Sequence, residues 1–160
     1  LLPRLARLAA QGDLDEFRFG FHRLMQVVIA VGIIGTLGSF AAGPALLRIV
    51  YDDTLDRGSL TMLALGSALY MVALATAQAV IALNGHARVG LGWLLGMVTF
   101  VGCTWLASDD LYTRVEIGLV ASSVVALLVF AYSLRELLNA GALMSPDSLS
   151  DALSDRPFEA

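Results

Sequence analysis

Charged side chains divide the sequence into four long apolar stretches. Residues 24–47, 58–85, 89–108 and 117–134 contain no Asp, Glu, Arg, Lys or His. At about 1.5 Å per residue, a helix over each stretch can cross a hydrocarbon core of about 30 Å. Backbone polar groups inside a bilayer must be satisfied within their own segment, which favours helices. The pattern therefore predicts an all-α, polytopic membrane helix bundle with four transmembrane helices.

The composition supports a membrane protein. Hydrophobic residues make up 58% of the 160 residues, charged residues 15%, and the mean hydropathy is +0.76. Soluble domains carry about 25% charged residues. A soluble domain of this size has too little interior to bury so much apolar surface. The net charge of −4 also excludes a nucleic-acid partner, because phosphate binding requires a basic surface.

The connections between the stretches predict the topology. Only residues 86–88 separate the second and third stretches, and Asn84-Gly85 before them is a helix stop in which Gly85 can take the left-handed cap. We expect these two helices to form a tight antiparallel hairpin. Arginine is more frequent on the side that holds both chain ends, which predicts that both ends are cytoplasmic. That side has Arg4, Arg7, Arg18, Arg23, Arg88, Arg135 and Arg156, and the other side has Arg48, Arg57 and Arg114.

Three regions follow from this organisation. Residues 1–23 are expected to form a cytoplasmic connector with a short amphipathic helix, N-capped by Asp13. Residues 24–138 form the four-span membrane domain, and residues 139–160, rich in Ser, Asp and Pro, form a disordered cytoplasmic tail. All ten basic residues are Arg, which is typical of GC-rich bacterial genomes and indicates a bacterial origin. We expect the chain to be a piece of a longer protein.

The apolar stretches offer little catalytic chemistry. Their lack of ionisable residues argues against a proton relay, a voltage sensor or an intramembrane metal site. Ser122, Ser123 and Cys103 have no His or carboxylate within a stretch to activate them, so we predict no enzyme activity, no metal and no cofactor.

The remaining polar and aromatic side chains allow two interpretations. Each polar residue within a span can bond a neighbouring helix or line a transport path. The candidates for the transport path are Gln78, Tyr70, Thr76 and Asn84. The aromatic residues near the span ends are predicted to be interfacial anchors, namely Tyr51, Trp93, Trp105 and Tyr112.

Small residues recur at spacings that suit close helix packing. Gly35, Ser39 and Gly43 follow at intervals of four in the first span, and Gly92 and Gly96 form a GxxxG pair in the third. Pro44 follows Gly43 and is expected either to bend the first helix or to end it.

The order of these features resembles the C-terminal part of bacterial polysaccharide flippases, the O-antigen-type exporters of the multidrug/oligosaccharidyl-lipid/polysaccharide superfamily. LLPRLARLAAQGDLDEFRFGFHR is similar to their cytoplasmic connector, and GPALLRIVYDDTL resembles their step before an outer loop. LALGSALYMVALATAQAVIALNGHARVGLGWLLG, residues 63–96, is the best match. The resemblance covers about residues 1–138.

The resemblance implies the C-terminal lobe of a larger transporter. The expected partners are membrane lipids, a lipid-linked oligosaccharide substrate and the N-terminal lobe of the same parent chain. Alternating access of two lobes would move the lipid-linked polysaccharide precursor outward. The alternatives are a lipid II or multidrug exporter of the same superfamily, or a standalone four-helix membrane assembly subunit.

Overall fold

The computed structural model describes residues 14–51, 56–106 and 110–143. Within these ranges the chain forms four helices and no strand: α2 (Leu14–Tyr51), α3 (Arg57–Ala82), α4 (His86–Leu106) and α5 (Leu111–Leu143). All four are long and apolar enough to cross a membrane, which confirms the predicted fold class. The expected cap Asp13, the rest of the connector 1–13 and the tail from 144 onward lie outside the described residues.

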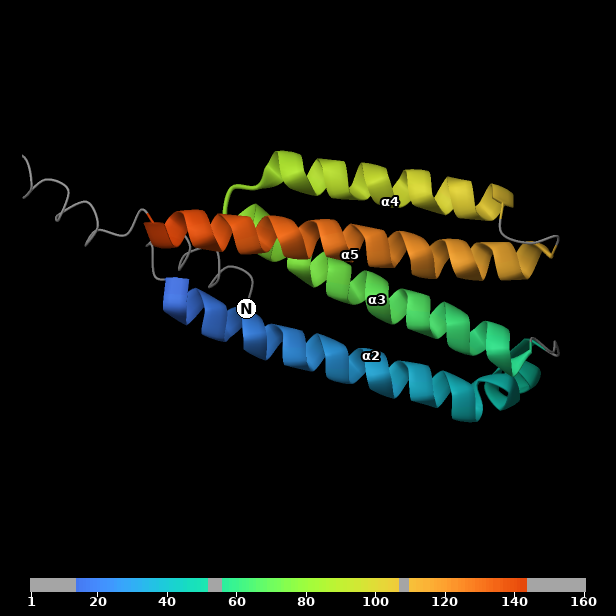
Figure 1. Cartoon of the computed structure of the whole chain (residues 1–160). Helices are drawn as coiled ribbons and strands as arrows, with labels where there is room; N and C mark the ends of the chain where they lie inside the picture. Colours follow the sequence, from blue (N-terminus) through green and yellow to red (C-terminus); the bar gives the residue numbers. More distant parts are fainter. Residues whose placement is uncertain (1–13, 52–55, 107–109, 144–160) are drawn as a thin grey trace, which may run out of the picture.

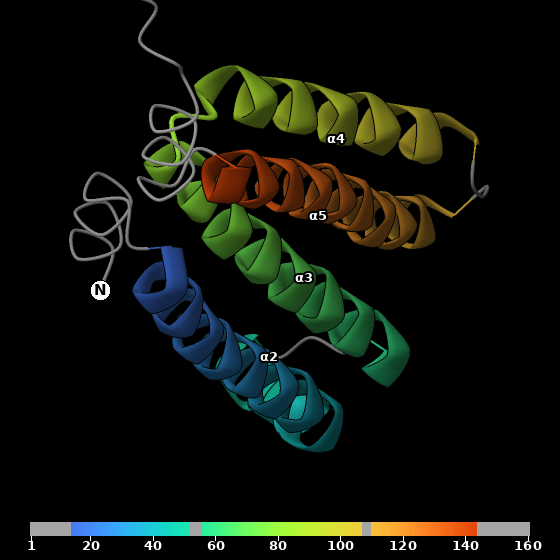
Figure 2. The same ribbon diagram turned by 60° about the vertical axis from the view of Figure 1, so that its left-hand side comes forward.

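The helices lie side by side in one layer, in the order α2, α3, α5, α4 (Figures 1 and 2). Successive helices alternate in direction, so α3 and α5 run parallel. The start of α2, the turn at residues 83–85 and the end of α5 share one end of the layer, here called the turn end. The buried core gathers towards this end, with Phe17, Ala73, Val80, Phe130 and Leu134 among its residues.

The helices extend beyond the charge-free stretches. The amphipathic helix expected before residue 24 and the first span form one continuous helix, α2. At the other end of the chain, α5 continues through Asn139 to Leu143, where the tail was expected to begin. Arg and Glu are good helix formers, so charge marks the limit of the apolar stretch without breaking the hydrogen-bonded backbone.

Pro44 does not end α2. The helix continues to Tyr51, although Pro44 cannot donate an N–H to the carbonyl of Phe40 and its ring crowds that carbonyl. The teal end of α2 changes direction in Figure 1. Of the two outcomes expected at Pro44, a bend and a helix end, the structure shows a bend within a continuous helix.

The turn between α3 and α4 is a Schellman motif. The Gly85 N–H donates to the Val80 carbonyl and the Asn84 N–H donates to the Ile81 carbonyl, each at 2.9 Å. Asn84, with φ of 62°, takes the left-handed position that the sequence assigned to Gly85. Gly85 is required for a different reason, since an added Cβ would lie 2.8 Å from Leu137 Cδ1.

α3 and α4 are antiparallel across a short turn, as predicted, but they do not pack tightly along their length, because α5 lies between them and α4 packs mainly on α5 (Figure 2). Gly92 and Gly96 create the contact surface on α4. An added Cβ at Gly92 would collide with the ring of Phe130, and one at Gly96 would lie 3.3 Å from the carbonyl oxygen of Ser122. Two glycines thus let α4 approach α5 more closely than a helix with side chains there would allow.

The contact between α2 and α3 uses two of the three small residues predicted for it, Ser39 and Gly43, and replaces Gly35 by Gly32. The Ser39 hydroxyl donates to the Leu60 carbonyl at 3.0 Å, and Gly43 also faces Leu60. Gly35 lies on an open face with nothing within 4 Å of an added Cβ, whereas Gly32 packs against Ala68. Gly35 and Gly43 are eight residues apart, which is about 80° more than two full helical turns, so they point in different directions. Gly32 and Gly43 are eleven residues apart, within about 20° of three full turns, so they share a face of α2.

Candidate functional site

A cleft opens between α2, α3 and α5 near the turn end, with a volume of about 440 Å³. We call it the basic cleft. Its lining comprises Arg18, Phe21 and Met25 of α2, Val72 and Thr76 of α3, and Leu127, Ala131, Leu134, Arg135, Leu138 and Asn139 of α5.

Arg18, Arg135 and Asn139 lie on the side of the basic cleft that is nearest the turn end, here called its mouth. Arg135 and Asn139 are one turn apart on the same face of α5, near its end, and Arg18 lies near the start of α2. Further into the layer, Met25 lies about 10 Å along α2 from Arg18, and Leu127 lies about 18 Å along α5 from Asn139. The cleft therefore has a cationic mouth and an apolar interior.

The two guanidinium groups are available to a ligand. Arg18 lies 3.8 Å from Asp15 Oδ1, but the Asp15 side chain is 97% exposed, so this ion pair is weak. Arg135 is exposed and has no ion-pair or hydrogen-bond partner within the described residues. A planar guanidinium presents a fork of donors that matches the geometry of phosphate and carboxylate groups.

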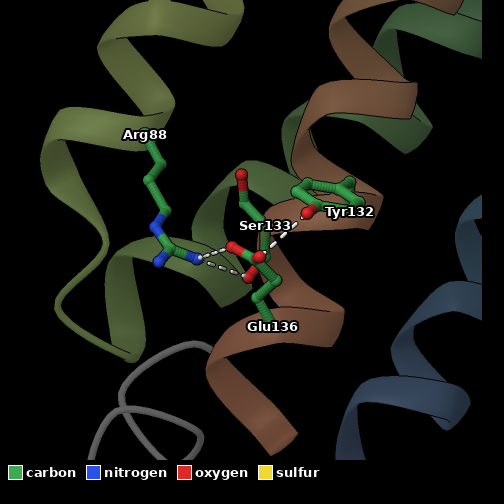
Figure 3. Close-up of polar contacts among 4 residues, drawn as sticks. All are labelled: Arg88, Tyr132, Ser133 and Glu136. Atoms are coloured by element: carbon green, nitrogen blue, oxygen red, sulfur yellow. Dashed lines mark hydrogen bonds and ion pairs between the residues drawn. The ribbon is translucent and has the colours of Figure 1, made fainter. Parts of the chain in front are cut away.

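Glu136 does not neutralise its neighbour Arg135. Figure 3 shows that Glu136 points towards α4, where its Oε2 lies 2.9 Å from Arg88 Nη1 and its Oε1 accepts a hydrogen bond from the Tyr132 hydroxyl at 2.8 Å. Arg88 also donates to the Ser133 carbonyl at 3.4 Å. The charge of Glu136 is thus engaged by Arg88, so the basic cleft keeps Arg135, which has no ion-pair partner among the described residues, and Arg18, which has only its weak pair with Asp15.

Of the four predicted path residues, Thr76 alone lines the basic cleft. It is 3% exposed, and its hydroxyl donates to the Val72 carbonyl at 2.8 Å. Because that proton is already used, the oxygen can serve a ligand only as an acceptor.

The other three path candidates lie elsewhere. Gln78 is half-buried, follows the exposed Leu74 by one turn, and has no hydrogen-bond partner in the described part of the chain. Asn84 belongs to the α3–α4 turn. Tyr70 is 43% exposed and lines a separate hollow of about 340 Å³ between α3, α4 and α5.

Trp93 differs from the predicted interfacial anchor. Its ring lies between Tyr70 of α3 and Phe130 of α5, with centroid distances of 5.4 and 5.2 Å. Trp93 therefore joins three helices through aromatic contacts inside the layer. Trp105 and Tyr112 are exposed at the end of the layer opposite the turn end, and the side chain of Tyr51 lies outside the described part.

Sequence reasoning missed three ionisable residues. Arg18 was placed in a connector, although it lies on the same face of α2 as Met25. Arg135 was placed beyond the last span, although it lies on the same face of α5 as Ala131. Glu116, placed in a loop, lies inside α5, is 8% exposed, and has an Oε1 atom without a hydrogen-bond partner in the described ranges. Helical periodicity extended past the apolar stretches would have indicated the two arginines.

Comparison of the chain with known protein families, with curated proteins and with solved structures gives no match. The described residues also contain no group of three His, Cys, Asp or Glu side chains that is placed to hold a metal ion. The basic cleft is therefore the candidate site that geometry and charge support.

Proposed function

We propose that the chain forms part of a bacterial inner-membrane flippase that moves lipid-linked polysaccharide precursors across the membrane by alternating access. The observation that carries this proposal is the basic cleft, with Arg18 and Arg135 at its mouth and an apolar interior. An amphiphile with an anionic headgroup and a hydrocarbon tail is complementary to both parts. A cationic drug is not, so the cleft favours a phosphorylated lipid over a multidrug substrate.

The open layer supports a second lobe as partner. Large apolar side chains are exposed on α2 and on α4, among them Ile34, Leu37, Met97 and Val101. Lipid covers such side chains at the periphery of a transporter, and the N-terminal lobe of the same parent chain would cover those that face inward. In this arrangement the turn end is cytoplasmic, and the cleft receives its lipid from the inner leaflet.

The test is export by the full-length protein with the cleft arginines neutralised. Each guanidinium–phosphate contact contributes about 1.5–3 kcal/mol, so Arg18→Gln and Arg135→Gln should each lower export about tenfold or more at unchanged protein level in the membrane. Arg23→Gln is the matched control, because Arg23 is exposed on α2 near the same end and does not line the cleft. Normal surface polymer in the Arg18→Gln, Arg135→Gln double variant would contradict the proposal.

Cysteine labelling tests the orientation. An impermeant thiol reagent added to intact cells, with Cys103 first replaced by Ser, should label Asp110→Cys and leave His86→Cys unlabelled. The two positions lie at opposite ends of the layer, so labelling of His86→Cys alone would reverse the orientation.

A further inference from the structure

The ion pair between Arg88 and Glu136 lies at the level of a membrane surface. Arg88 directly precedes the charge-free stretch 89–108, and Glu136 follows the stretch 117–134 by two residues. Since α4 and α5 are antiparallel, both apolar stretches end at the ion pair, which lies at the turn end of the layer. The pair is therefore placed where the hydrocarbon core of a bilayer meets the lipid headgroups.

Both partners of the ion pair can form further bonds. The Nη1 atom of Arg88 makes the contacts to Glu136 Oε2 at 2.9 Å and to the Ser133 carbonyl at 3.4 Å (Figure 3). Nε and Nη2 of Arg88 have no partner among the described residues and remain donors. Each carboxylate oxygen of Glu136 has one partner and a second lone pair. Because both side chains are nearly half exposed, a ligand can reach the cation and the anion together.

Tyr132 connects this polar pair to the apolar surface next to it. Its hydroxyl donates to Glu136 Oε1 at 2.8 Å, although its side chain is 65% exposed and belongs to the apolar stretch. Leu128, one turn further into the stretch, is 63% exposed. The hydroxyl of Tyr132 thus lies at the level of the headgroups and its ring at the level of the acyl chains, as is usual for tyrosine at a membrane surface.

Apolar side chains continue from the ion pair towards the middle of both helices. On α4, Leu91 and Leu95 follow Arg88 by three and seven residues, so they share its face, and both are exposed. On α5, Val129 precedes Glu136 by seven residues and is half-buried. A lipid with its headgroup on the ion pair would therefore lay an acyl chain against both helices.

The charges of the pair select the kind of headgroup. An anionic headgroup is attracted by Arg88 but repelled by Glu136, whose Oε2 is only 2.9 Å from the guanidinium. A zwitterionic headgroup supplies a phosphate for Arg88 and a cation for Glu136. The ammonium of phosphatidylethanolamine has N–H donors for a charge-assisted hydrogen bond to the carboxylate, whereas the methylated nitrogen of phosphatidylcholine has none. The pair is thus complementary to phosphatidylethanolamine.

We propose that α4 and α5 hold one phosphatidylethanolamine molecule at the turn end, as a bound lipid that is not transported. Its phosphate lies on Arg88, its ammonium on Glu136, and an acyl chain along Leu91, Leu95 and Val129. The site is separate from the basic cleft, whose lining contains neither member of the ion pair. It requires only that the turn end lies at a membrane surface, so it is independent of the substrate and of the direction of transport.

The test is photo-crosslinking to the purified full-length protein in detergent. The probe is a phosphatidylethanolamine with a diazirine in its acyl chain, and mass spectrometry locates the modified residues. We expect modification between residues 88 and 95 and between residues 128 and 136. Dioleoyl phosphatidylethanolamine should compete at these segments about fivefold or more strongly than dioleoyl phosphatidylcholine or dioleoyl phosphatidylglycerol, as expected for one charge-assisted hydrogen bond.

Substitutions in the ion pair should change the headgroup preference. Arg88→Gln removes the phosphate contact and should lower crosslinking about fivefold or more. Glu136→Gln removes the ammonium contact and leaves the charge of Arg88 uncompensated, so phosphatidylglycerol should become the strongest of the three competitors. A misfolded variant would lose all three lipids alike. The matched controls are Glu16→Gln and Arg23→Gln, which alter exposed charges of α2 near the same end and should change neither yield nor preference.

Three outcomes would overturn the inference. They are equal competition by phosphatidylethanolamine and phosphatidylcholine in the unmodified protein, modification that avoids both segments, and an unchanged headgroup preference in Glu136→Gln. Modification that avoids both segments is also the result expected if another part of the parent protein covers this surface. Export by the variants of Arg18 and Arg135 tests the proposed function separately, because those residues lie outside this site.

Discussion

Arg88 in the first turn of α4 and Glu136 near the end of α5 form an ion pair across the turn end, with Nη1 and Oε2 2.9 Å apart. The pair joins the start of α4 to the last part of α5, two antiparallel helices whose connecting loop lies at the opposite end of the layer. Both side chains are nearly half exposed, at 40% and 46%. An ion pair this exposed contributes little to the stability of the fold, so its main effect is to position α4 on α5.

The first prediction concerns this ion pair. A double-mutant cycle with Arg88→Ala and Glu136→Ala should give a coupling energy of about 0.5–1 kcal/mol, the range for partly exposed pairs. The measurement is thermal unfolding of the purified full-length protein in detergent. A coupling energy near zero would show that the two charges do not interact in the folded protein.

The second prediction concerns the approach of α4 to α5. Gly92→Ala places a methyl group against the Phe130 ring and should destabilise the protein by about 1–3 kcal/mol, the usual effect of overpacking. Gly90→Ala is the matched control, because it is on the same helix with nothing within 4 Å of an added Cβ. The control should be neutral or stabilising by up to about 1 kcal/mol through helix propensity. Equal effects of the two variants on thermal unfolding would contradict the α4–α5 contact.

The third prediction concerns the buried carboxyl of Glu116. Because its Oε1 is buried without a hydrogen-bond partner in the described residues, removal of the charge should not destabilise the fold. Glu116→Gln is expected to leave the melting temperature unchanged or raise it, whereas Glu136→Gln, which loses an ion pair, should lower it. A large decrease for Glu116→Gln would mean that its carboxylate has a partner in the assembled protein.

The fourth prediction is a pH dependence at the start of α5. The Thr113 backbone N–H, and then its hydroxyl, donate to Asp110 Oδ2 at 2.9 Å and hold the pKa of Asp110 below its ordinary 3.8. A lowered pKa stabilises the folded state fully above pH 3.8, and the contribution is lost as the pH falls through the folded-state pKa. Asp110→Asn should therefore show a smaller acid-induced decrease in melting temperature than the unmodified protein. Identical acid profiles would exclude this cap.

The fifth prediction concerns Gln78, which bonds none of the described residues of the other helices. Gln78→Leu should leave the melting temperature unchanged or higher, because it removes an unpaired amide from an apolar environment. If Gln78 faces the transport path, export should fall at the same time. Loss of stability with normal export would instead assign it to packing against another part of the parent protein.

Hydrophobic patterning alone was sufficient to predict the four helices. A stretch of about twenty apolar residues crosses a bilayer as a helix, because its backbone groups must form hydrogen bonds within the segment. The Asn84-Gly85 stop also marked the end of α3, but residues 86–88, which were expected to connect the two helices, form the first turn of α4. The pattern did not distinguish Asn84 from Gly85 as the left-handed residue, since both types tolerate that conformation.

Tertiary packing decided the order of the helices and the site. The position of α5 between α3 and α4 depends on the fit of Gly92 to Phe130 and of Gly66 to Leu119, contacts between residues far apart in the chain. The basic cleft likewise requires that Arg18 of α2 and Arg135 of α5 line the same hollow. The sequence determined which segments lie in the membrane, because that depends on each segment's own hydrophobicity. Only the tertiary structure decided which faces meet, because lipid solvates every apolar face equally well and shape complementarity makes the choice.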